Sequence, residues 1–331
     1  MKFLKHWCDG SNKIIENQEA YMRIPRQLQP GDTIGIFSPS SPIESKAVNT
    51  MCKYFEQRGY TVNVAPNTLA TFGFMAGSPQ QRADDLNLLL HDPTVRMVMT
   101  STGGAGAVHL LPLIDYPALA ADPKIVVGLS DPSILLLALT SATGVPTFHG
   151  PNGVEFGGLC PLTTFTEENF WPMLTGEFSL PYSFPVQEHF QVLRSGKSVE
   201  GTLIGGNLER LSLLIGTPWE PDWQGAVLFV EEFLSKDTSF DALLAHLHLS
   251  GVFEKICCLL VGKPVQMEGY EQDGVTLEEI ILRNCAGYDF PIVSDLLIGH
   301  TDDKLTLPIG CRVGLDTGRG LLELYDLPGT G

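Results

Sequence analysis

Residues 124–135 read KIVVGLSDPSIL, which predicts a buried strand, a serine and the start of a helix. The β-branched apolar run at its start is typical of a parallel strand that is buried on both faces. Asp131 and Pro132 are residue types that begin helices, and we expect a helix over Ser133–Thr143. Ser130 therefore lies at a strand-to-helix turn, near helix N–H groups that can stabilise an oxyanion. Many α/β proteins carry an inert serine at such a turn, so this pattern alone does not assign catalysis.

The size and charge of the chain exclude several classes of protein. Its 331 residues are enough for two domains of ordinary size. The formal net charge is −17, from 21 basic and 38 acidic side chains, which argues against nucleic acid or an anionic membrane as a partner. No apolar run reaches the roughly 18 residues that a membrane-spanning helix needs. We therefore expect neither nucleic acid nor a membrane among its partners.

Cysteine and histidine usage indicates neither disulfides nor a metal site. The 7 cysteines are scattered and form no CxxC pair, which favours buried free thiols in a reducing cytoplasm. His246 and His248 lack the H-E-x-x-H pattern of a zinc site and fall on an expected helix. The sequence therefore predicts a cytoplasmic protein without a bound metal.

The first half of the chain alternates strands with helices. Strands are expected at Thr33–Phe37, Thr61–Ala65, Val95–Thr100, Lys124–Leu129 and Val145–Phe148. Helices are expected at Ser45–Arg58, from a cap at Ser78 to about Leu90, and at Ser133–Thr143 with Gly144 as its end. This order predicts βαβ units and a mostly parallel sheet. Ligands gather at the carboxyl ends of such strands, where Ser38–Ser41, Gly103–Gly106 and Ser130 fall.

A second α/β module follows an irregular segment. Gly150–Lys197 is rich in aromatic residues and prolines, which predicts either a linker with a lid over a cleft or packing between two domains. Beyond it, strands are expected at Gly201–Ile204, Ala226–Val230, Ile256–Val261 and Pro291–Val293, helices at Asn207–Ile215, Ser239–Leu249 and Thr276–Cys285, and a hairpin from Lys304–Leu307 and Gly320–Tyr325. We divide the chain into an N-terminal extension (1–30), a nucleophile domain (31–155), a linker or lid (156–198) and a C-terminal domain (199–331).

Three side chains at expected strand ends form a chemical constellation in the order Ser130, Glu231, His300. A histidine can accept the serine proton and return it to a leaving amine, while a carboxylate orients the imidazole. Glu232 competes with Glu231, because alternation along a strand lets only one of them face the cleft. The α/β-hydrolases share this order but need G-x-S-x-G, and here Pro132 replaces the second glycine.

The glycine cluster Gly103–Gly106 follows another expected strand. Such a cluster can form a phosphate cradle, an oxyanion hole or a tight turn. It does not match G-x-G-x-x-G, so a dinucleotide site is weakly supported. Because glycine lets backbone N–H groups approach a reacting carbonyl, an oxyanion hole is physically reasonable.

Several motifs in one order make the chain resemble the serine peptidases that comprise the LD-carboxypeptidases and the microcin C immunity proteins. The resemblance runs from about Gly31 to the C-terminus. It is carried by Gly31-Asp32-Thr33-Ile34-Gly35, Ser101-Thr102-Gly103-Gly104, Gly128-Leu129-Ser130-Asp131, His149-Gly150-Pro151, Ile204-Gly205-Gly206-Asn207-Leu208, Leu228-Phe229-Val230-Glu231, Gly299-His300 and Leu307-Pro308-Ile309-Gly310.

The resemblance implies a fold and a mechanism. It implies a Rossmann-like N-terminal domain, a smaller C-terminal domain, and an active site between them. It also implies a cofactor-free, cytoplasmic and commonly homodimeric enzyme. By resemblance Ser130 is the nucleophile, His300 the general base and Glu231 its orienting acid. The N–H groups of Gly104 and Asp131 form the implied oxyanion hole.

The substrate is less well defined. LD-carboxypeptidases typically have an arginine before the glycine pair and an aromatic residue after it, where this chain has Thr102 and Ala105. The chain looks more like the immunity branch, which cleaves an amide between an aminoacyl or peptidyl group and a nucleotide. That branch stacks a linker aromatic on the nucleobase, and its linker is longer than the one here. Gly103, Asn207 and Trp171 are our substrate-binding candidates, and Tyr182 or Phe184 could replace Trp171.

Two alternatives stay open. A murein tetrapeptide would need a cation for the carboxylate of its terminal D-amino acid, such as Arg82 or Lys263. A non-catalytic protein would instead close its two lobes on a small ligand without turnover. The predicted function is a serine carboxypeptidase-type amidohydrolase acting on a small peptide or an aminoacyl-nucleotide.

Overall fold

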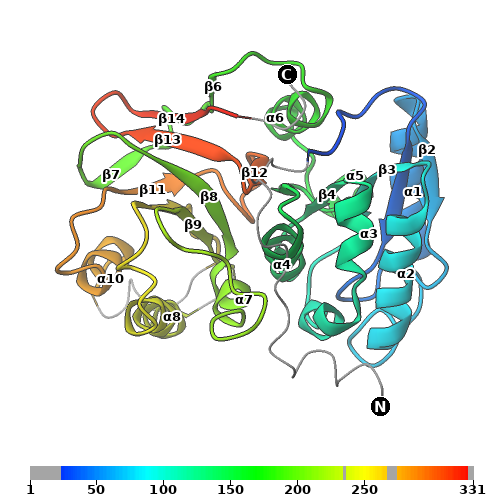
Figure 1. The fold of residues 1–331 in the computed structure, drawn as a ribbon, viewed down its shortest axis with the longest axis horizontal. Coiled ribbons are helices and arrows are strands. Elements are labelled where there is room, and N and C mark those ends of the chain that lie inside the picture. Colours follow the sequence, from blue (N-terminus) through cyan, green and yellow to red (C-terminus); the bar gives the residue numbers. More distant parts are fainter. Residues whose placement is uncertain (1–23, 234–235, 267–273, 327–331) are drawn as a thin grey trace.

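The computed structural model describes residues 24–233, 236–266 and 274–326, which form two β-sheets with helices around them (Figure 1). The first sheet has 6 strands and the second has 8. Helix α4 (Ser133–Thr143) lies between the sheets and contacts both β5 (Thr147–His149) and β8 (Val199–Asn207). None of the helices in these ranges is both long enough and apolar enough to cross a membrane. The predicted α/β class with two sheet-based domains is confirmed.

The first sheet has the strand order β12-β5-β4-β3-β1-β2. Its remaining strands are β1 (Thr33–Phe37), β2 (Thr61–Val64), β3 (Val95–Thr100), β4 (Ile125–Gly128) and β12 (Leu307–Ile309). Every neighbouring pair is parallel except β12 with β5. All residues of β1 and β4 are buried, as their continuous apolar sequences predict.

The helices of the first half are α1 (Ser45–Gln57), α2 (Pro79–His91), η1 (Ala107–Leu113, a 3-10 helix), α3 (Tyr116–Ala121), α4 and α5 (Gly153–Phe156). Helix α2 begins with the predicted capping box, in which Ser78 and Gln81 bond to each other's backbone N–H groups. Helix α4 spans Ser133–Thr143 with Gly144 as its C-cap, as expected, but its N-cap is Pro132 rather than Asp131. The side chain of Asp131 is therefore free to bind elsewhere.

The second sheet has the order β6-β14-β13-β8-β9-β10-β11-β7, with a parallel centre from β8 to β11. Its other strands are β6 (Tyr182–Ser183), β7 (Gln191–Arg194), β9 (Val227–Glu231), β10 (Cys258–Gly262), β11 (Ile292–Leu296), β13 (Arg312–Asp316) and β14 (Leu321–Leu324). The parallel register places Asn207 opposite Glu231. The carboxyl ends of β8 and β9 therefore bring these two predicted site residues together.

Among the described residues, the helices beside the second sheet are α7 (Leu208–Ser212), α8 (Asp237–Leu249) and α10 (Leu277–Asn284). Asn207 caps α7, and its side chain accepts a hydrogen bond from Arg210 N. Helix α8 begins two residues before the expected start at Ser239: Lys236 is its N-cap, and Ser239 N donates to Lys236 O. Residues just before α8, 234–235, lie outside the described ranges.

The aromatic segment between the sheets contains a regular helix, contrary to the prediction. Helix α6 (Thr164–Thr175) begins at Thr163, whose side chain accepts a hydrogen bond from Thr166 N, and it ends at Gly176. Phe170 on this helix is fully buried. The burial of this helix supports the alternative in which the segment packs between the domains, rather than the one in which it forms a lid over a cleft.

The C-terminal pairing also differs from the prediction. Lys304–Leu307 is not a hairpin strand: β12 begins at Leu307 and pairs antiparallel with β5 of the first sheet. The hairpin forms between β13 and β14, with Asp316 accepting N–H bonds at the turn. Local sequence pattern could not reveal the β12 pairing, because its partner strand is far away along the chain.

All 6 cysteines in the described ranges are free thiols, as predicted, but only Cys258, Cys285 and Cys311 are buried and Cys160 is exposed, contrary to the expectation that all are buried. Burial raises the pKa of Cys258 and Cys311 well above the ordinary thiol value. Cys8 and most of the predicted N-terminal extension, 1–30, lie outside the described residues.

Candidate active site

Ser130 lies directly between β4 and α4 in a backbone conformation that non-glycine residues rarely adopt, with a φ of 70°. The side-chain amide of Asn152 bonds to both backbone polar groups of the preceding residue, Leu129. Leu129 N donates to Asn152 Oδ1 at 3.0 Å, and Asn152 Nδ2 donates to Leu129 O at 3.1 Å. Asn152 itself is buried and also accepts from Thr100 Oγ1. The surroundings therefore hold the serine turn in its unusual conformation.

The side chain of Asp131 ties the serine turn to three other parts of the chain. Its Oδ2 accepts from Ser40 Oγ at 2.7 Å and from Ala107 N at 2.8 Å. Its Oδ1 lies 3.2 Å from Arg210 Nε in the second half of the chain. Burial raises the pKa of Asp131, while these donors and charges act in the opposite direction. The sequence predicts Asp131 only as a helix-start residue and as a backbone N–H donor, not as the centre of this side-chain network.

Two glycines of the predicted cluster pack tightly beside the serine. A Cβ at Gly103 would lie 3.0 Å from Ser130 Oγ and 2.8 Å from its Cβ. Gly104 has a φ of +120°, and a Cβ there would lie 1.9 Å from Ser41 Oγ. Glycine is thus required at both positions. At Gly103 the reason is the close approach of Ser130, and at Gly104 it is both the close approach of Ser41 and the positive φ.

His300 and Glu231 form a buried hydrogen-bonded pair. His300 Nδ1 lies 2.6 Å from Glu231 Oε2, and the two side chains are 14% and 1% exposed. Burial lowers the pKa of His300, but the charge and hydrogen bond of Glu231 and the charges of Glu155 and Glu232 raise it, for a net rise. Burial likewise raises the pKa of Glu231, but the charge and hydrogen bond of His300 lower it below the ordinary value. The ring of Phe233 stacks on His300 at 4.4 Å.

The neighbouring Glu232 has a different environment from Glu231. Its Oε1 accepts from Asn207 Nδ2 at 3.1 Å and from Phe233 N at 3.0 Å, and its Oε2 accepts from Glu209 N at 3.2 Å. Glu232 lines the cavity described next, whereas Glu231 lies behind His300. The two acids thus point to different sides, as strand alternation predicts.

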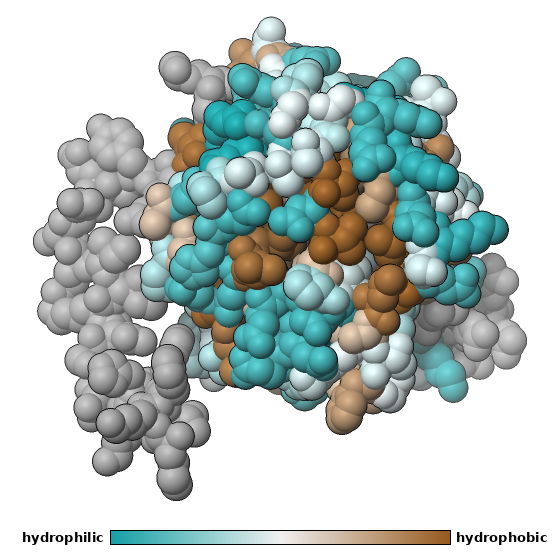
Figure 2. Space-filling model, turned by 90° about the vertical axis from the view of Figure 1, so that its right-hand side faces the viewer, coloured by the Kyte–Doolittle hydropathy of each residue, from teal (hydrophilic) through white to brown (hydrophobic). Residues whose placement is uncertain are grey.

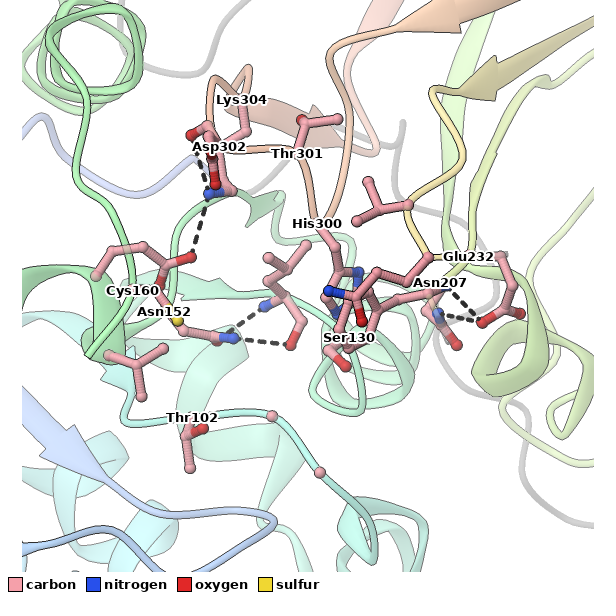
Figure 3. A pocket seen from close by; sticks show the side chains of 18 of the residues that line it. Thr102, Ser130, Asn152, Cys160, Asn207, Glu232, His300, Thr301, Asp302 and Lys304 are labelled. Carbon is pink, nitrogen blue, oxygen red and sulfur yellow. Dashed lines mark hydrogen bonds and ion pairs between the residues drawn. The ribbon is translucent and has the colours of Figure 1, made fainter. Parts of the chain in front are cut away.

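A cavity of about 670 Å³ connects these groups. Figure 3 shows Ser130, His300, Asn207 and Glu232 on one side of it, with Asp302 and Lys304 farther along. Of the predicted site residues, Gly103, Gly104, Ser130, Asn207 and His300 line this cavity. Among the described residues, no cluster of three or more histidine, cysteine or acidic side chains is arranged to hold a metal ion.

Trp171 lies elsewhere and does not line the cavity. Its indole stacks on Tyr60 with ring centroids 5.5 Å apart, and its Nε1 donates to Tyr54 Oη at 3.1 Å. These contacts fix α6 to the first domain, so the expectation that Trp171 binds substrate does not fit this structure. From the predicted linker, only Cys160 and Pro161 reach the cavity.

The cations of the cavity also differ from those proposed from sequence. Arg82 is buried and donates to the backbone oxygens of Pro39 and Gly106, and neither it nor Lys263 lines the cavity. The lining cations are Arg210 and Lys304. Lys304 Nζ lies 3.3 Å from Glu155 Oε1, and both side chains are almost fully buried.

Sequence reasoning missed Asn152, Arg210, Glu155 and Lys304, which all line the cavity. Asn152 comes just after β5, at the carboxyl edge where such residues gather, so its position was a usable signal. The other three depend on contacts between distant segments and carry no local motif.

Comparison with known proteins identifies the family of the chain. Residues 34–150 match the model of the LD-carboxypeptidase N-terminal domain, and residues 200–315 match that of the LD-carboxypeptidase C-terminal domain. The microcin C7 self-immunity protein MccF of Escherichia coli is 31% identical over 319 residues, covering 87% of this chain and 92% of MccF.

Solved structures give the same result. The structure of MccF in complex with glutamyl sulfamoyl guanosine matches with a TM-score of 0.87 and 28% identity, covering 93% of this chain and 100% of that one. The muramoyltetrapeptide carboxypeptidase from Oxalobacter formigenes matches with a TM-score of 0.79 and 29% identity, covering 89% and 99%. The chain therefore belongs to the LD-carboxypeptidase family and is a serine peptidase of the carboxypeptidase type.

Proposed function

We propose that the chain hydrolyses an amide bond through an acyl-enzyme, with Ser130 as nucleophile, His300 as general base and Glu231 as the acid that orients it. The observation that carries this proposal is the 2.6 Å bond between His300 and Glu231, in a cavity that Ser130 also lines. A histidine held at Nδ1 by a carboxylate presents Nε2 to a nucleophile. The strained turn at Ser130 adds support, because such strain concentrates at active sites.

The reaction proceeds in two halves. Ser130 Oγ attacks the scissile carbonyl carbon as its proton passes to His300 Nε2, and Glu231 stabilises the resulting imidazolium. The N–H groups of Gly104 and Asp131 stabilise the oxyanion. The tetrahedral intermediate then collapses, the C–N bond breaks, and the leaving amine takes the proton from His300. Water attacks the acyl-enzyme by the same route and releases the acid and the serine.

The substrate that we propose first is an aminoacyl- or peptidyl-nucleotide joined through an amide. Its support is the similarity to MccF, whose solved complexes contain glutamyl sulfamoyl guanosine and aspartyl sulfamoyl adenosine. The sequence Ser101-Thr102-Gly103-Gly104 favours the same branch. The cavity of about 670 Å³ is within the usual range for small-molecule sites.

A murein tetrapeptide is the second candidate. It is supported by the match to muramoyltetrapeptide carboxypeptidase and by two cations on the cavity wall, Arg210 and Lys304. These side chains replace Arg82 and Lys263 as candidate partners for a terminal D-amino acid carboxylate. Each is paired with a buried acid, which weakens its attraction for a further carboxylate.

A side-by-side assay separates the two substrates. Purified protein is incubated with a peptidyl-adenylate analogue and with murein tetrapeptide, and both products are quantified by mass spectrometry. We expect kcat/KM for the nucleotide to exceed that for the tetrapeptide by at least about tenfold, a difference of about 1.4 kcal/mol in transition-state binding. The reverse ratio would assign the murein activity. Hydrolysis of neither compound would overturn both candidates.

We also propose that the chain forms a homodimer through the edge of the first sheet. Strand β2 ends that sheet, and five large hydrophobic side chains on and after it are exposed: Val64, Leu69, Phe72, Phe74 and Leu88. Figure 2 views the molecule from this side and shows hydrophobic residues gathered in the middle of the face. A second copy pairing along β2 would cover both the strand edge and these side chains.

Sedimentation velocity tests the dimer. We expect the wild-type chain to sediment as a dimer and the Phe72→Glu/Phe74→Glu variant as a folded monomer. The matched control is Leu249→Glu, since Leu249 is exposed on the second half of the chain, at the end of α8. A monomeric wild-type protein, or a variant that remains dimeric, would contradict the proposed interface.

A further inference from the structure

A second histidine lies against the acid of the proposed catalytic pair. His149 is the last residue of β5, and its side chain is fully buried. Its Nε2 lies 4.0 Å from Glu231 Oε1, the oxygen that does not bind His300. Glu231 is therefore flanked by two imidazoles, one facing each carboxylate oxygen.

The facing atoms of His149 and Glu231 lack other partners. Within the described ranges, neither ring nitrogen of His149 has a hydrogen-bond partner. The Oε1 atom of Glu231 also has none. Buried polar atoms are nearly always hydrogen-bonded, and an unsatisfied one costs about 1–3 kcal/mol. A movement of about 1 Å brings Nε2 and Oε1 to an ordinary hydrogen-bond distance. Each atom is thus placed to supply the other's missing bond, beside the Asn207 side chain, which also acts on the Glu231 carboxyl and lowers its pKa.

The charge state of His149 suits a donor to a carboxylate. Burial lowers its pKa to about 4, although Glu231 raises it and His300 lowers it further. The ring is therefore neutral near pH 7, with one nitrogen as donor and the other as acceptor. The charged groups that act on it are Glu231 of β9 and His300 of the loop after β11.

We propose that His149 is a positioning residue for the reaction: its Nε2–H binds Glu231 Oε1 and holds the carboxylate in the plane in which Oε2 binds His300. This inference rests on the proposed function, because it assigns a second partner to the proposed orienting acid. His149 is buried and is not among the residues that line the cavity. It acts on the reaction only through Glu231. Other charges near His300 come from Glu155 and Glu232.

A role in packing alone is the competing explanation. The ring of His149 meets Phe229 edge to face, with centroids 5.1 Å apart and planes at 70°. A phenylalanine at position 149 would keep that contact and remove the donor. A glutamine would place an N–H donor close to the position of Nε2. The two variants therefore separate packing from hydrogen bonding.

The first experiment measures kcat, KM and the pH profile of His149→Phe and His149→Gln with the better substrate. We expect His149→Phe to fold, to keep KM within about twofold, and to lose about 10–100-fold in kcat, since small misplacements of catalytic groups have effects of that size. His149→Gln should recover most of the loss. A His149→Phe protein with unchanged kcat and an unchanged pH profile would overturn the proposal.

The second experiment needs neither turnover nor folding of a variant at position 149. Nitrogen-15 NMR of the histidine rings of the Ser130→Ala protein reads the tautomer of His149, assigned by loss of its signals in His149→Gln or, if that variant does not fold, by through-bond correlation. We expect a neutral ring with the proton on Nε2, protected from exchange. A proton on Nδ1 would overturn the proposal, because Nε2 could not then donate to Glu231. This result is independent of whether Ser130 is the nucleophile, so the two proposals can fail separately.

Discussion

Nδ1 of His300 lies 2.6 Å from Oε2 of Glu231, although the two residues are 69 positions apart in the chain. Glu231 ends β9, and His300 lies in the loop that follows β11, two strands away in the same sheet. The parallel centre of the second sheet brings both to its carboxyl edge. That edge faces Ser130 of the first sheet across the cavity.

In the proposed mechanism, this pair determines the pH dependence of hydrolysis. The net rise in the pKa of His300 means that the proposed base becomes neutral only above the ordinary histidine value of about 6.5. We expect kcat/KM to fall on the acid side with a midpoint above about 6.5, measured over pH 5–9. Glu231→Gln removes the charge that raises this pKa, so its midpoint should move to lower pH while activity falls. A wild-type midpoint well below 6 would contradict the assignment of His300 as base.

Both residues of the pair stabilise the folded state, but their contributions are lost at opposite ends of the pH range. The pKa of His300 is raised in the folded state, so its contribution is present at acid pH and is lost as the pH rises through that raised value. The pKa of Glu231 is lowered, so its contribution is present at neutral pH and is lost as the pH falls through that lowered value.

Gly103→Ala tests the packing around the nucleophile. The new Cβ would lie 3.0 Å from Ser130 Oγ, so we expect kcat to fall by about 100-fold as the serine is displaced. Gly318→Ala is the matched control, because its nearest atom is 3.4 Å away, in the β13–β14 turn. Steady-state kinetics and circular dichroism of both variants provide the measurement. Wild-type kcat in folded Gly103→Ala would show that the serine position is not constrained as described.

Lys304 and Glu155 form a buried ion pair on the cavity wall, with side chains 4% and 5% exposed. Removing one partner of such a pair typically costs about 3–5 kcal/mol, because the other charge is left buried alone. Lys304→Met should therefore lower the free energy of unfolding more than Lys304→Met/Glu155→Gln does. Denaturant unfolding of the wild type, both single variants and the double variant measures the coupling. Additive losses would mean that the pair does not interact as the geometry indicates.

Trp171→Phe separates packing from substrate stacking. Because the indole packs on Tyr60 and Tyr54 outside the cavity, we expect a loss of about 1–2 kcal/mol in stability and KM within about twofold of the wild type. A tenfold rise in KM for the nucleotide, without a similar rise for the tetrapeptide, would return Trp171 to the substrate site.

Much of the fold could be predicted from the sequence, because local patterns decide it. The apolar runs of β1 and β4 and the capping boxes that begin α2 and α10 each contain their own signal. The positions of Ser130 and Glu231 at strand ends follow from the same patterns, whereas the expected strand before Asn207 ended too early, at Ile204, and β8 runs on to Asn207. The pairing of β12 with β5 was not predictable in this way. Leu307–Ile309 follows strands of the second sheet in the chain, and nothing in its sequence specifies a partner in the first sheet.

The site was harder to predict where it depends on contacts between segments. The sequence predicts Trp171 as a substrate-binding residue in an irregular linker, but in the structure Trp171 lies on helix α6 and packs on Tyr60. The sequence predicts a strand at Lys304, whereas in the structure Lys304 pairs with Glu155 on the cavity wall. Contacts between residues that are far apart in the chain produce no periodic pattern in a single sequence, so they could not be predicted from it.

The central claim is that Ser130 is the nucleophile, and the most direct test is hydrolysis by Ser130→Ala. Wild-type and variant proteins are compared at equal concentration on the peptidyl-adenylate analogue and on murein tetrapeptide, with thermal unfolding to verify the fold. We predict that the variant keeps its melting temperature and loses about 10⁴–10⁶-fold in kcat on whichever compound the wild type cleaves. A folded Ser130→Ala protein that retains activity within about tenfold of the wild type would contradict the account.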